Sequence, residues 1–501
     1  MSKKHRRTPA PATSAAPAAA APAVPPLPEP RGALARGFHA LALAVLVALS
    51  FALYSPSLDD RYVWDDQALV LDNQDLRQSD VAGIFRHTLG QWGGFQSDAY
   101  RPIQVLTHLI DRLLFGEGPA GAHASSILWH ALAAFAVYLL WSTLSGRKAP
   151  ALAAAVLFAA HPAAVESVAY ISGRADTLSL LWCALSVASY VAASRRAGVL
   201  SMMLYTVSSL AMALSALSKE AGLMTPLLCL VSAWLLCGHP LGSQIVRAAA
   251  VHASPLIVYA LLRSGITTDP APAAQALALS ERLLYLPKVL WDYTMLTLVP
   301  SASNLHMEYL FGPYRRAVRE PGYFLFFVYA GLLSWVLWRA WSRSGPAVRA
   351  ALVWTALALS PVLNLYVKIN APIAAHWLYA PLAGLCFAAV AGLEKLCGRL
   401  PAQAARRVMI VALAVPTLYL WAQTGSYAGV WSDDISLYRY TAERVPGSFR
   451  AANNLCVALQ KERRYAEALA CFEQLKTETS NPTVDHNLEA LRQEMAASGV
   501  R

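Results

Sequence analysis

Long apolar stretches recur along this chain, and they constrain its fold more than any other feature of the sequence. Each is long enough, or nearly so, to cross the hydrocarbon core of a bilayer as a helix, which takes about 20 residues. The stretches fall at residues 37–54, 123–145, 149–165, 175–193, 199–217, 221–238, 248–265, 321–341, 350–367, 377–394 and 408–425. The pattern predicts an all-α fold, a polytopic membrane helix bundle with about eleven transmembrane helices.

The composition agrees with a place in the bilayer. Of the 501 residues, 56% are hydrophobic and 14% are charged, whereas soluble domains average about 45–50% and about 25%. This difference excludes an ordinary soluble enzyme, and the apolar content excludes a disordered protein. The seven cysteines form no CxxC pair, so neither a disulfide-built scaffold nor a zinc module is indicated.

The positive charges fall on alternate loops. The net charge of +11 would suit a nucleic-acid partner, but membrane proteins concentrate Lys and Arg in their cytoplasmic loops. The basic positions are Lys3, Lys4, Arg6, Arg7, Arg147, Lys148, Arg195, Arg196, Arg247, Arg343, Arg349, Lys395, Arg399, Arg406 and Arg407. We therefore expect a cytoplasmic amino terminus, a carboxyl terminus outside the cytoplasm, and no nucleic-acid partner. The excess of Arg over Lys and the abundant Ala favour a bacterial cell (inner) membrane.

Three regions follow from this topology. Residues 1–36 are a basic Ala/Pro-rich tract that we expect to be a disordered cytoplasmic tail; a cleaved signal peptide is the alternative, but the first apolar run begins late for one. Residues 37–425 form the transmembrane domain, with a large Asp-rich outer loop at 55–122. The segments 101–115 and 281–299 are apolar at helical spacing but carry charges, so we expect them to lie along the membrane face.

Residues 426–501 turn soluble in composition. The run 451–475 has the apolar and small residues of a tetratricopeptide helix pair, and 483–496 supplies a third helix after the Asn481–Pro482 break. One such unit cannot bury a core alone, so it must pack on a preceding helix at 434–445, on the membrane domain or on a partner.

Cys456 and Cys471 take mirror positions about the turn of this helix pair. Antiparallel helices that cross at small residues come within the Cα separation that a disulfide needs, about 4.4–6.8 Å, and the outer compartment permits a bridge. The alternative is that both are small packing residues at a helix crossing, where a free Cys commonly behaves as a small hydrophobic residue.

Polar residues gather at the predicted outer ends of the spans. Asp65 and Asp66 follow the first span in the run Tyr62-Val63-Trp64-Asp65-Asp66, although a carboxylate pair in a loop is commonly a solvated cap or turn. The other members are Tyr100 with Arg101, His123, His161 with Glu166, Arg174 with Asp176, Lys219 with Glu220, and His306. Each alone can be a cap or a structural ion pair. Charges at membrane depth are costly, however, and their convergence on one face predicts a functional cavity there.

Four stretches carry a family resemblance: WDDQALVLDNQDL, YRPIQVLTHLIDRLLFGEGPAGAHASSILWHAL, HPAAVESVAYISGRADTLS and LSKEAGLMTP. They resemble, in the same order, signatures of the transmembrane and tetratricopeptide-repeat-containing O-mannosyltransferases and their bacterial relatives. The resemblance implies a GT-C fold, a polyprenyl-phosphate sugar that enters from the lipid bilayer, and an acceptor protein or glycan that arrives from outside. In that family the first outer loop holds the catalytic acidic residue, which would be Asp65 or Asp66.

The chemistry of these residues agrees with glycosyl transfer. Attack by a Ser or Thr hydroxyl on the anomeric carbon, with lipid phosphate leaving, needs a carboxylate base and cations that hold the phosphate. The expected donor and phosphate residues are Arg101, Arg174, Lys219, His123 and His161, with Glu166, Asp176, Glu220, His306 and His376 in support. No second carboxylate stands out as a nucleophile, so we expect one inverting displacement. We expect no metal and no other cofactor, because Arg and Lys can neutralise a monophosphate leaving group.

The chain departs from the family at two places. Around residue 376 the family usually has an acidic residue followed by Arg or a similar group, whereas this chain reads Ala375-His376-Trp377-Leu378-Tyr379-Ala380-Pro381. The tetratricopeptide region is also short, so acceptor choice does not transfer from the longer relatives.

The leading hypothesis is an integral-membrane glycosyltransferase that moves a monosaccharide, mannose by the resemblance, to a protein Ser/Thr hydroxyl on the non-cytoplasmic face. One alternative is a catalytically silent membrane scaffold that recruits partners through its tetratricopeptide segment. Another is a transporter of lipid-linked sugars, which internal repeats with broken helices would indicate.

Overall fold

The computed structural model describes residues 33–92, 97–266, 277–301, 304–367, 369 and 371–498, with side chains from residue 37 onward. The described residues form helices and no strand, which confirms the all-α prediction. The predicted tail at 1–36 lies outside the described residues, apart from its last four, which begin the first helix.

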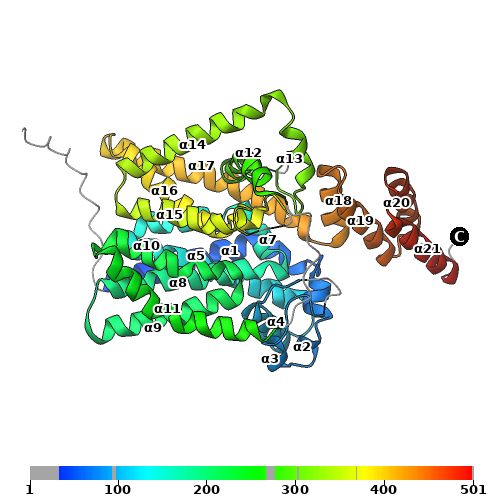
Figure 1. Ribbon diagram of the computed structural model, residues 1–501, viewed down its shortest axis with the longest axis horizontal. Coiled ribbons are helices and arrows are strands. Elements are labelled where there is room, and N and C mark those ends of the chain that lie inside the picture. The colour runs from blue at the N-terminus through cyan, green and yellow to red at the C-terminus, as the bar shows by residue number, and fades with distance from the viewer. Residues whose placement is uncertain are drawn as a thin grey trace, which may run out of the picture.

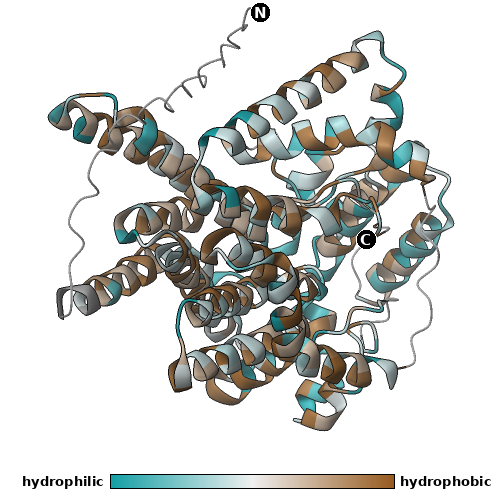
Figure 2. Ribbon diagram, turned by 60° about the vertical axis from the view of Figure 1, so that its left-hand side comes forward, coloured by the Kyte–Doolittle hydropathy of each residue, from teal (hydrophilic) through white to brown (hydrophobic). Residues whose placement is uncertain are grey.

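Nine helices in the described ranges are long and apolar enough to cross a membrane. They are α1 Ala33–Tyr54, α5 Pro119–Ser145, α8 Ala175–Ser194, α9 Gly198–Ser218, α10 Thr225–Cys237, α11 Leu241–Ser264, α14 Phe324–Arg343, α16 Tyr379–Cys397 and α17 Ala402–Ala428. Short helical turns extend several of them: η1 Ser55–Asp59, η5 Glu220–Met224, η6 Pro321–Tyr323, η8 Ala375–Leu378 and η9 Gly429–Trp431. The long helices form one bundle (Figure 1) and are predominantly apolar (Figure 2), which confirms the predicted polytopic architecture.

The predicted span at 149–165 is bent. Its first half is α6 Lys148–Ala159, and its second half, Pro162–Val168, leaves at 61°. Pro162 has no N–H and holds the preceding His161 in an extended conformation, with φ −81° and ψ 128°, so the α6 hydrogen bonds stop there. The predicted span at 149–165 is therefore a bent pair of helices, which is either one broken crossing or a re-entrant segment.

The predicted span at 350–367 is shorter than expected. It corresponds to α15 Pro346–Leu359 and the turn η7 Ser360–Val362, which together fall short of spanning length. The eleven expected crossings are thus nine spans, one bent pair and one short helix within the part of the chain that the structure describes.

The chain after the bend stays inside the bundle. This inner segment, residues 161–174, contains η3 Pro162–Ala164, α7 Val165–Val168 and η4 Ile171–Arg174, and nearly all of it is buried. Gly173 is its closest packing point, because a Cβ atom there would lie 1.9 Å from the carbonyl oxygen of Glu166. Only a glycine fits at this position.

Basic loops meet at one end of the bundle. Arg147 forms an ion pair with Glu394 (2.8 Å), and Arg195 donates to the carbonyl oxygen of Thr143 (2.6 Å). These contacts join loops that are far apart in the sequence, as expected of loops that share one side of a membrane.

The outer loop and the carboxyl-terminal helices lie at the opposite end, on the right in Figure 1. The loop contains η2 Gln67–Leu71, α2 Gln74–Arg77, α3 Val81–Ile84 and α4 Pro102–Phe115, which share a small apolar cluster. The segments 101–115 and 281–299 are helical, as α4 and α12 Leu279–Leu298, and α13 Phe311–Ala317 follows the second. Their orientation along the membrane face stays a prediction.

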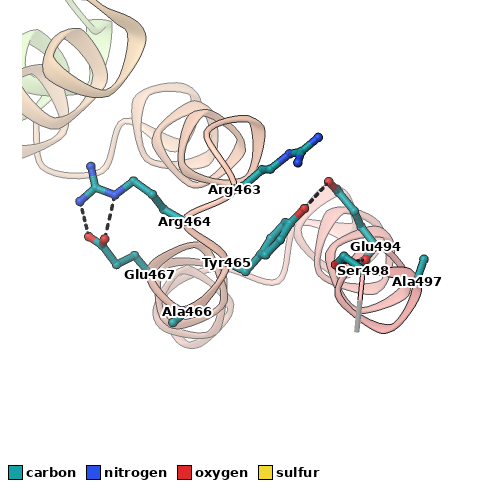
Figure 3. A pocket seen from close by; sticks show the side chains of 8 residues that line it. All are labelled: Arg463, Arg464, Tyr465, Ala466, Glu467, Glu494, Ala497 and Ser498. Carbon is teal, nitrogen blue, oxygen red and sulfur yellow. Dashed lines mark hydrogen bonds and ion pairs between the residues drawn. The ribbon is translucent and has the colours of Figure 1, made fainter. Parts of the chain in front are cut away.

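The C-terminal segment, residues 434–498, is a row of four helices. They are α18 Asp434–Arg444, α19 Phe449–Lys461, α20 Tyr465–Glu478 and α21 Pro482–Ala497. Cys456 and Cys471 are joined by a disulfide between α19 and α20, with their Cα atoms 5.4 Å apart, so the alternative of two free packing thiols is wrong. Beside a shallow hollow between α20 and α21, the Tyr465 hydroxyl donates to Glu494 at 3.0 Å (Figure 3).

Candidate active site

The outer loop and the inner segment meet at Asp66. Its buried carboxylate accepts hydrogen bonds from the Ser172 N–H (2.8 Å), the Ser172 hydroxyl (2.5 Å) and the Val63 N–H (3.1 Å). Burial raises the pKa of Asp66 to about 7, although these hydrogen bonds act to lower it. Because its oxygens are occupied by protein donors, Asp66 anchors the loop to the inner segment.

Asp65 is the partly exposed member of the pair. Burial raises the pKa of Asp65, while the charge of Arg450 and the hydroxyl of Tyr170 oppose the rise. The preceding Trp64 has a φ of 55°, a left-handed conformation that a bulky residue adopts only where its surroundings hold it. Here its N–H donates to Asp434 (2.9 Å) and its ring stacks on Tyr170 (5.3 Å between centroids). The backbone that presents Asp65 is therefore fixed from two sides.

Arg101 begins α4 and forms a bidentate ion pair with Glu220 of η5. Its Nε and one terminal nitrogen donate to the carboxylate at 3.1 and 3.0 Å, and the Tyr100 N–H donates to the other oxygen at 3.2 Å. The side chains are 22% exposed for Arg101 and 40% exposed for Glu220. A guanidinium this accessible can exchange its carboxylate for an incoming anion such as a phosphate.

Lys219 pairs with Asp176 at 2.6 Å beside this site. The pair lines one end of a cavity of about 40 Å³, whose other walls include Leu180, Leu228 and Trp354. Charged groups at membrane depth are costly and tend to mark a functional site.

Arg174 is completely buried, and its two terminal nitrogens donate to protein groups, whereas its Nε has no partner among the described residues. It pairs with Asp111 of α4 and donates to the Ala122 carbonyl (2.9 Å) and the Ser126 hydroxyl (3.0 Å) of α5. Arg174 therefore holds η4 against α4 and α5. His123, also on α5, is buried as well.

A second polar group surrounds Glu166. Its carboxylate contacts His376 Nδ1 (2.6 Å) and accepts a hydrogen bond from the Tyr427 hydroxyl (3.0 Å). His306 stacks against Tyr309 with ring centroids 4.0 Å apart, close enough to Glu166 for the carboxylate charge to act on both rings. His376 stands where the family resemblance led us to expect an acidic residue, and in this chain it faces one.

The structure thus brings the predicted residues into two groups instead of one. In the first group, Tyr170 connects the pair Asp65 and Asp66 to the ion pairs of Arg101 with Glu220 and of Lys219 with Asp176, because it interacts with both Asp65 and Arg101. The second group contains Glu166, His306 and His376. Arg174 and His123 belong to neither group. His161 contacts the Thr297 carbonyl (3.1 Å) at the bend after α6.

Sequence reasoning did not single out four residues of these groups. Tyr170 and Ser172 lie within the stretch HPAAVESVAYISGRADTLS. The family resemblance of this stretch could therefore have pointed to them. No local pattern marks Tyr427 or Arg450, because all of their partners named here lie more than 100 residues away in the sequence.

No family model matches the chain. Among curated proteins it is similar to protein O-mannosyl-transferase TMTC3 of Mus musculus, with 25% identity over 481 residues, 86% of this chain and 50% of that protein. It is also similar to protein O-mannosyl-transferase TMTC1 of Homo sapiens, with 25% identity over 526 residues, 91% of this chain and 57% of that protein. The chain spans about half the length of the curated relatives it matches.

Two solved structures are similar over most of the chain. One is the archaeal oligosaccharyltransferase AglB from Archaeoglobus fulgidus, with a TM-score of 0.47, 15% identity, and coverage of 85% of this chain and 60% of that one. The other is ArnT from Cupriavidus metallidurans, with a TM-score of 0.39, 14% identity, and coverage of 89% and 81%. Over most of its own length the chain is thus similar to the protein O-mannosyl-transferases TMTC3 and TMTC1.

Proposed function

We propose that this protein is an integral-membrane glycosyltransferase of the GT-C type. It moves a monosaccharide, mannose, from a polyprenyl-phosphate donor to a Ser or Thr hydroxyl of an acceptor protein on the non-cytoplasmic face. The observation that carries the proposal is the difference between two adjacent carboxylates: Asp66 is buried and accepts hydrogen bonds from protein donors, whereas Asp65 is partly exposed. Tyr170 interacts electrostatically with both Asp65 and Arg101. The names of the curated relatives support the same reaction class.

Asp65 is the general base of the proposed reaction. Its carboxylate takes the proton of the acceptor hydroxyl as the hydroxyl oxygen attacks the anomeric carbon, and the lipid phosphate leaves with the bonding electron pair. A single displacement of this kind inverts the anomeric centre. Tyr170, whose hydroxyl bonds Asp65, orients the carboxylate.

Arg101 and Lys219 hold the donor phosphate in this proposal. Both are paired with carboxylates in the structure, Glu220 and Asp176, so phosphate binding means that one negative partner replaces another. Exchange is easiest at Arg101, because Glu220 is the more exposed of the two carboxylates and exposed pairs are weak.

Arg174 has a positioning role in this scheme, because its guanidinium forms a buried ion pair with Asp111. The basic loops at the other end of the bundle face the cytoplasm of a bacterium with a periplasm, which places the amino terminus inside and the C-terminal segment outside.

The test is a transfer assay with the full chain in lipid vesicles. Polyprenyl-phosphate [³H]mannose and a Ser/Thr-containing acceptor protein are supplied, and label on protein is counted. Wild type is expected to transfer label, and Asp65→Asn to lose about 10²–10⁴-fold in rate, the usual contribution of a general base. Asp98→Asn, at an exposed carboxylate of the same loop, is the matched control and should keep full activity.

Two outcomes contradict the proposal. Full transfer by Asp65→Asn removes the base assignment. Absence of transfer by wild type from any polyprenyl-phosphate sugar removes the enzyme assignment and leaves the scaffold that recruits partners through its C-terminal segment.

A further inference from the structure

The first residues of α19 reach the loop that presents Asp65. The Arg450 guanidinium lies 5.7 Å from the centre of the Trp64 ring, next to Asp65, and its Nε contacts the Glu308 carboxylate at 3.3 Å. Three parts of the chain therefore meet at Arg450: the outer loop, the segment that follows α12, and the C-terminal segment. The hydroxyl of Ser448, the residue that caps α19 two positions earlier, also donates to Glu308.

The C-terminal segment is attached to the outer loop on both sides of this point. The Arg61 N–H donates to the carbonyl of Ser432, just before the C-terminal segment (2.9 Å), and the Trp64 N–H donates to the Asp434 carboxylate within it (2.9 Å). At the other end of α19, Arg61 forms an ion pair with Glu462 (2.7 Å). These contacts fix the position of α19 against the loop, so the place of Arg450 follows from the packing of whole elements.

We infer that Arg450 is a positioning residue of the transfer reaction, which the C-terminal segment contributes to the active site so that the Asp65 carboxylate is held charged and ready to accept a proton. This inference rests on the proposed function. It gives the C-terminal segment a part in the chemistry itself, beyond any part in choosing the acceptor.

The surroundings of Asp65 single out Arg450. The titratable groups that act on Asp65 or feel its charge are Asp66 on its own loop, Tyr170 on the inner segment, and Tyr438 and Arg450 on the C-terminal segment. Arg450 is the cation of this set. A positive charge beside a carboxylate favours its ionised form, which is the form a general base needs.

A purely structural role explains Arg450 less well. Its side chain is 50% exposed, and an ion pair with so exposed a partner contributes little to stability. Glu308, in contrast, is 11% exposed, and its carboxylate contacts the Arg450 guanidinium. It therefore competes with Asp65 for the same guanidinium. Removing Arg450 and removing the charge of Glu308 should therefore change the pKa of Asp65 in opposite directions.

The experiment is the pH dependence of kcat in the vesicle assay for Arg450→Gln, Arg450→Lys and Glu308→Gln. Arg450→Gln should raise the pKa of Asp65, which moves the acidic limb of the profile to higher pH by about half a unit or more and leaves the rate above the limb largely intact. Arg450→Lys keeps a charge and should restore most of the wild-type profile. Glu308→Gln frees the guanidinium for Asp65 and should move the limb to lower pH.

Arg492→Gln is the matched control, because Arg492 forms an exposed pair with Glu473 elsewhere on the C-terminal segment, and its profile should equal that of wild type. An acidic limb that stays in place in both Arg450→Gln and Glu308→Gln overturns the inference while wild-type transfer keeps the proposed function. If Arg450→Gln does not fold, the positions of the acidic limb in Arg450→Lys and Glu308→Gln test the inference instead. Absence of transfer by wild type is a failure of the proposed function, and it is seen before any variant is compared.

Discussion

Asp66 accepts hydrogen bonds from both the N–H and the hydroxyl of Ser172, a residue 106 positions further along the chain. This contact joins the outer loop to the buried inner segment, and it removes Asp66 from the surface on which its neighbour Asp65 remains accessible. Two residues that are indistinguishable in type and adjacent in sequence thereby take different roles.

The raised pKa of Asp66 predicts a pH dependence of stability. A carboxyl whose pKa rises on folding, here from 3.8 to about 7, stabilises the fold fully below the lower value, and this contribution is lost as the pH rises through the higher one. Between about pH 5 and about pH 8 the thermal unfolding midpoint of wild type should therefore fall more than that of Asp66→Asn. Differential scanning fluorimetry in detergent measures both, with Asp98→Asn as control. Equal falls in wild type and Asp66→Asn would contradict the assignment.

Arg101 is expected to bind the donor phosphate through its planar guanidinium. Arg101→Ala should lower kcat/KM for the polyprenyl-phosphate sugar by about 10–100-fold, the value of one charge-assisted contact, and Arg101→Lys should retain part of the activity. Glu220→Gln removes the competing carboxylate of the Arg101 pair and should lower KM for the donor. Wild-type kinetics in both Arg101 variants would assign the residue a structural role.

Gly173 is expected to tolerate no side chain. Gly173→Ala places a Cβ atom 1.9 Å from the Glu166 carbonyl, so the inner segment must shift, at a cost of about 1–3 kcal/mol in the free energy of unfolding. Gly392→Ala on α16 meets nothing within 4 Å and should leave stability unchanged or slightly higher. Thermal unfolding midpoints of the two variants test this, and equal midpoints would show that the inner segment packs more loosely than the structure indicates.

The disulfide predicts the number of reactive thiols. Denatured protein without reductant should show five thiols, those of Cys183, Cys229, Cys237, Cys386 and Cys397, and seven after reduction. The bridge between Cys456 and Cys471 closes a loop of 15 residues, which is worth about 3 kcal/mol to the helix pair. Seven thiols before reduction would eliminate the bridge.

The topology predicts which loops are accessible from outside. In a cysteine-free background, single cysteines at Asp98 in the outer loop and Ala466 in the C-terminal segment should react with an impermeant maleimide added to intact cells. A cysteine at Ala197, beside the basic Arg195 and Arg196, should not react until the membrane is opened. Labelling at Ala197 alone would invert the orientation.

The family resemblance and the helical segments were readable from sequence because both are local properties. A stretch of apolar residues must satisfy its backbone hydrogen bonds internally in lipid, so hydropathy alone predicts a helix at each of the eleven positions. One of the two exceptions to a straight span has a local cause, because Pro162 breaks the second half of 149–165. The other is α15, which falls short of spanning length. The resemblance likewise depends on short runs such as HPAAVESVAYISGRADTLS.

Sequence by itself determined that this chain is an all-α membrane bundle with its polar residues at one end, and it determined which residues to examine there. Only the tertiary structure decided that Asp65 is partly exposed and Asp66 buried. It also decided that Arg174 forms an ion pair with Asp111 and that Arg450 lies near Asp65. The reason is physical. Hydropathy and backbone propensity act over a few neighbouring residues, whereas the burial of a carboxylate and the partner of a charge depend on which distant segments the packing brings within a few ångströms.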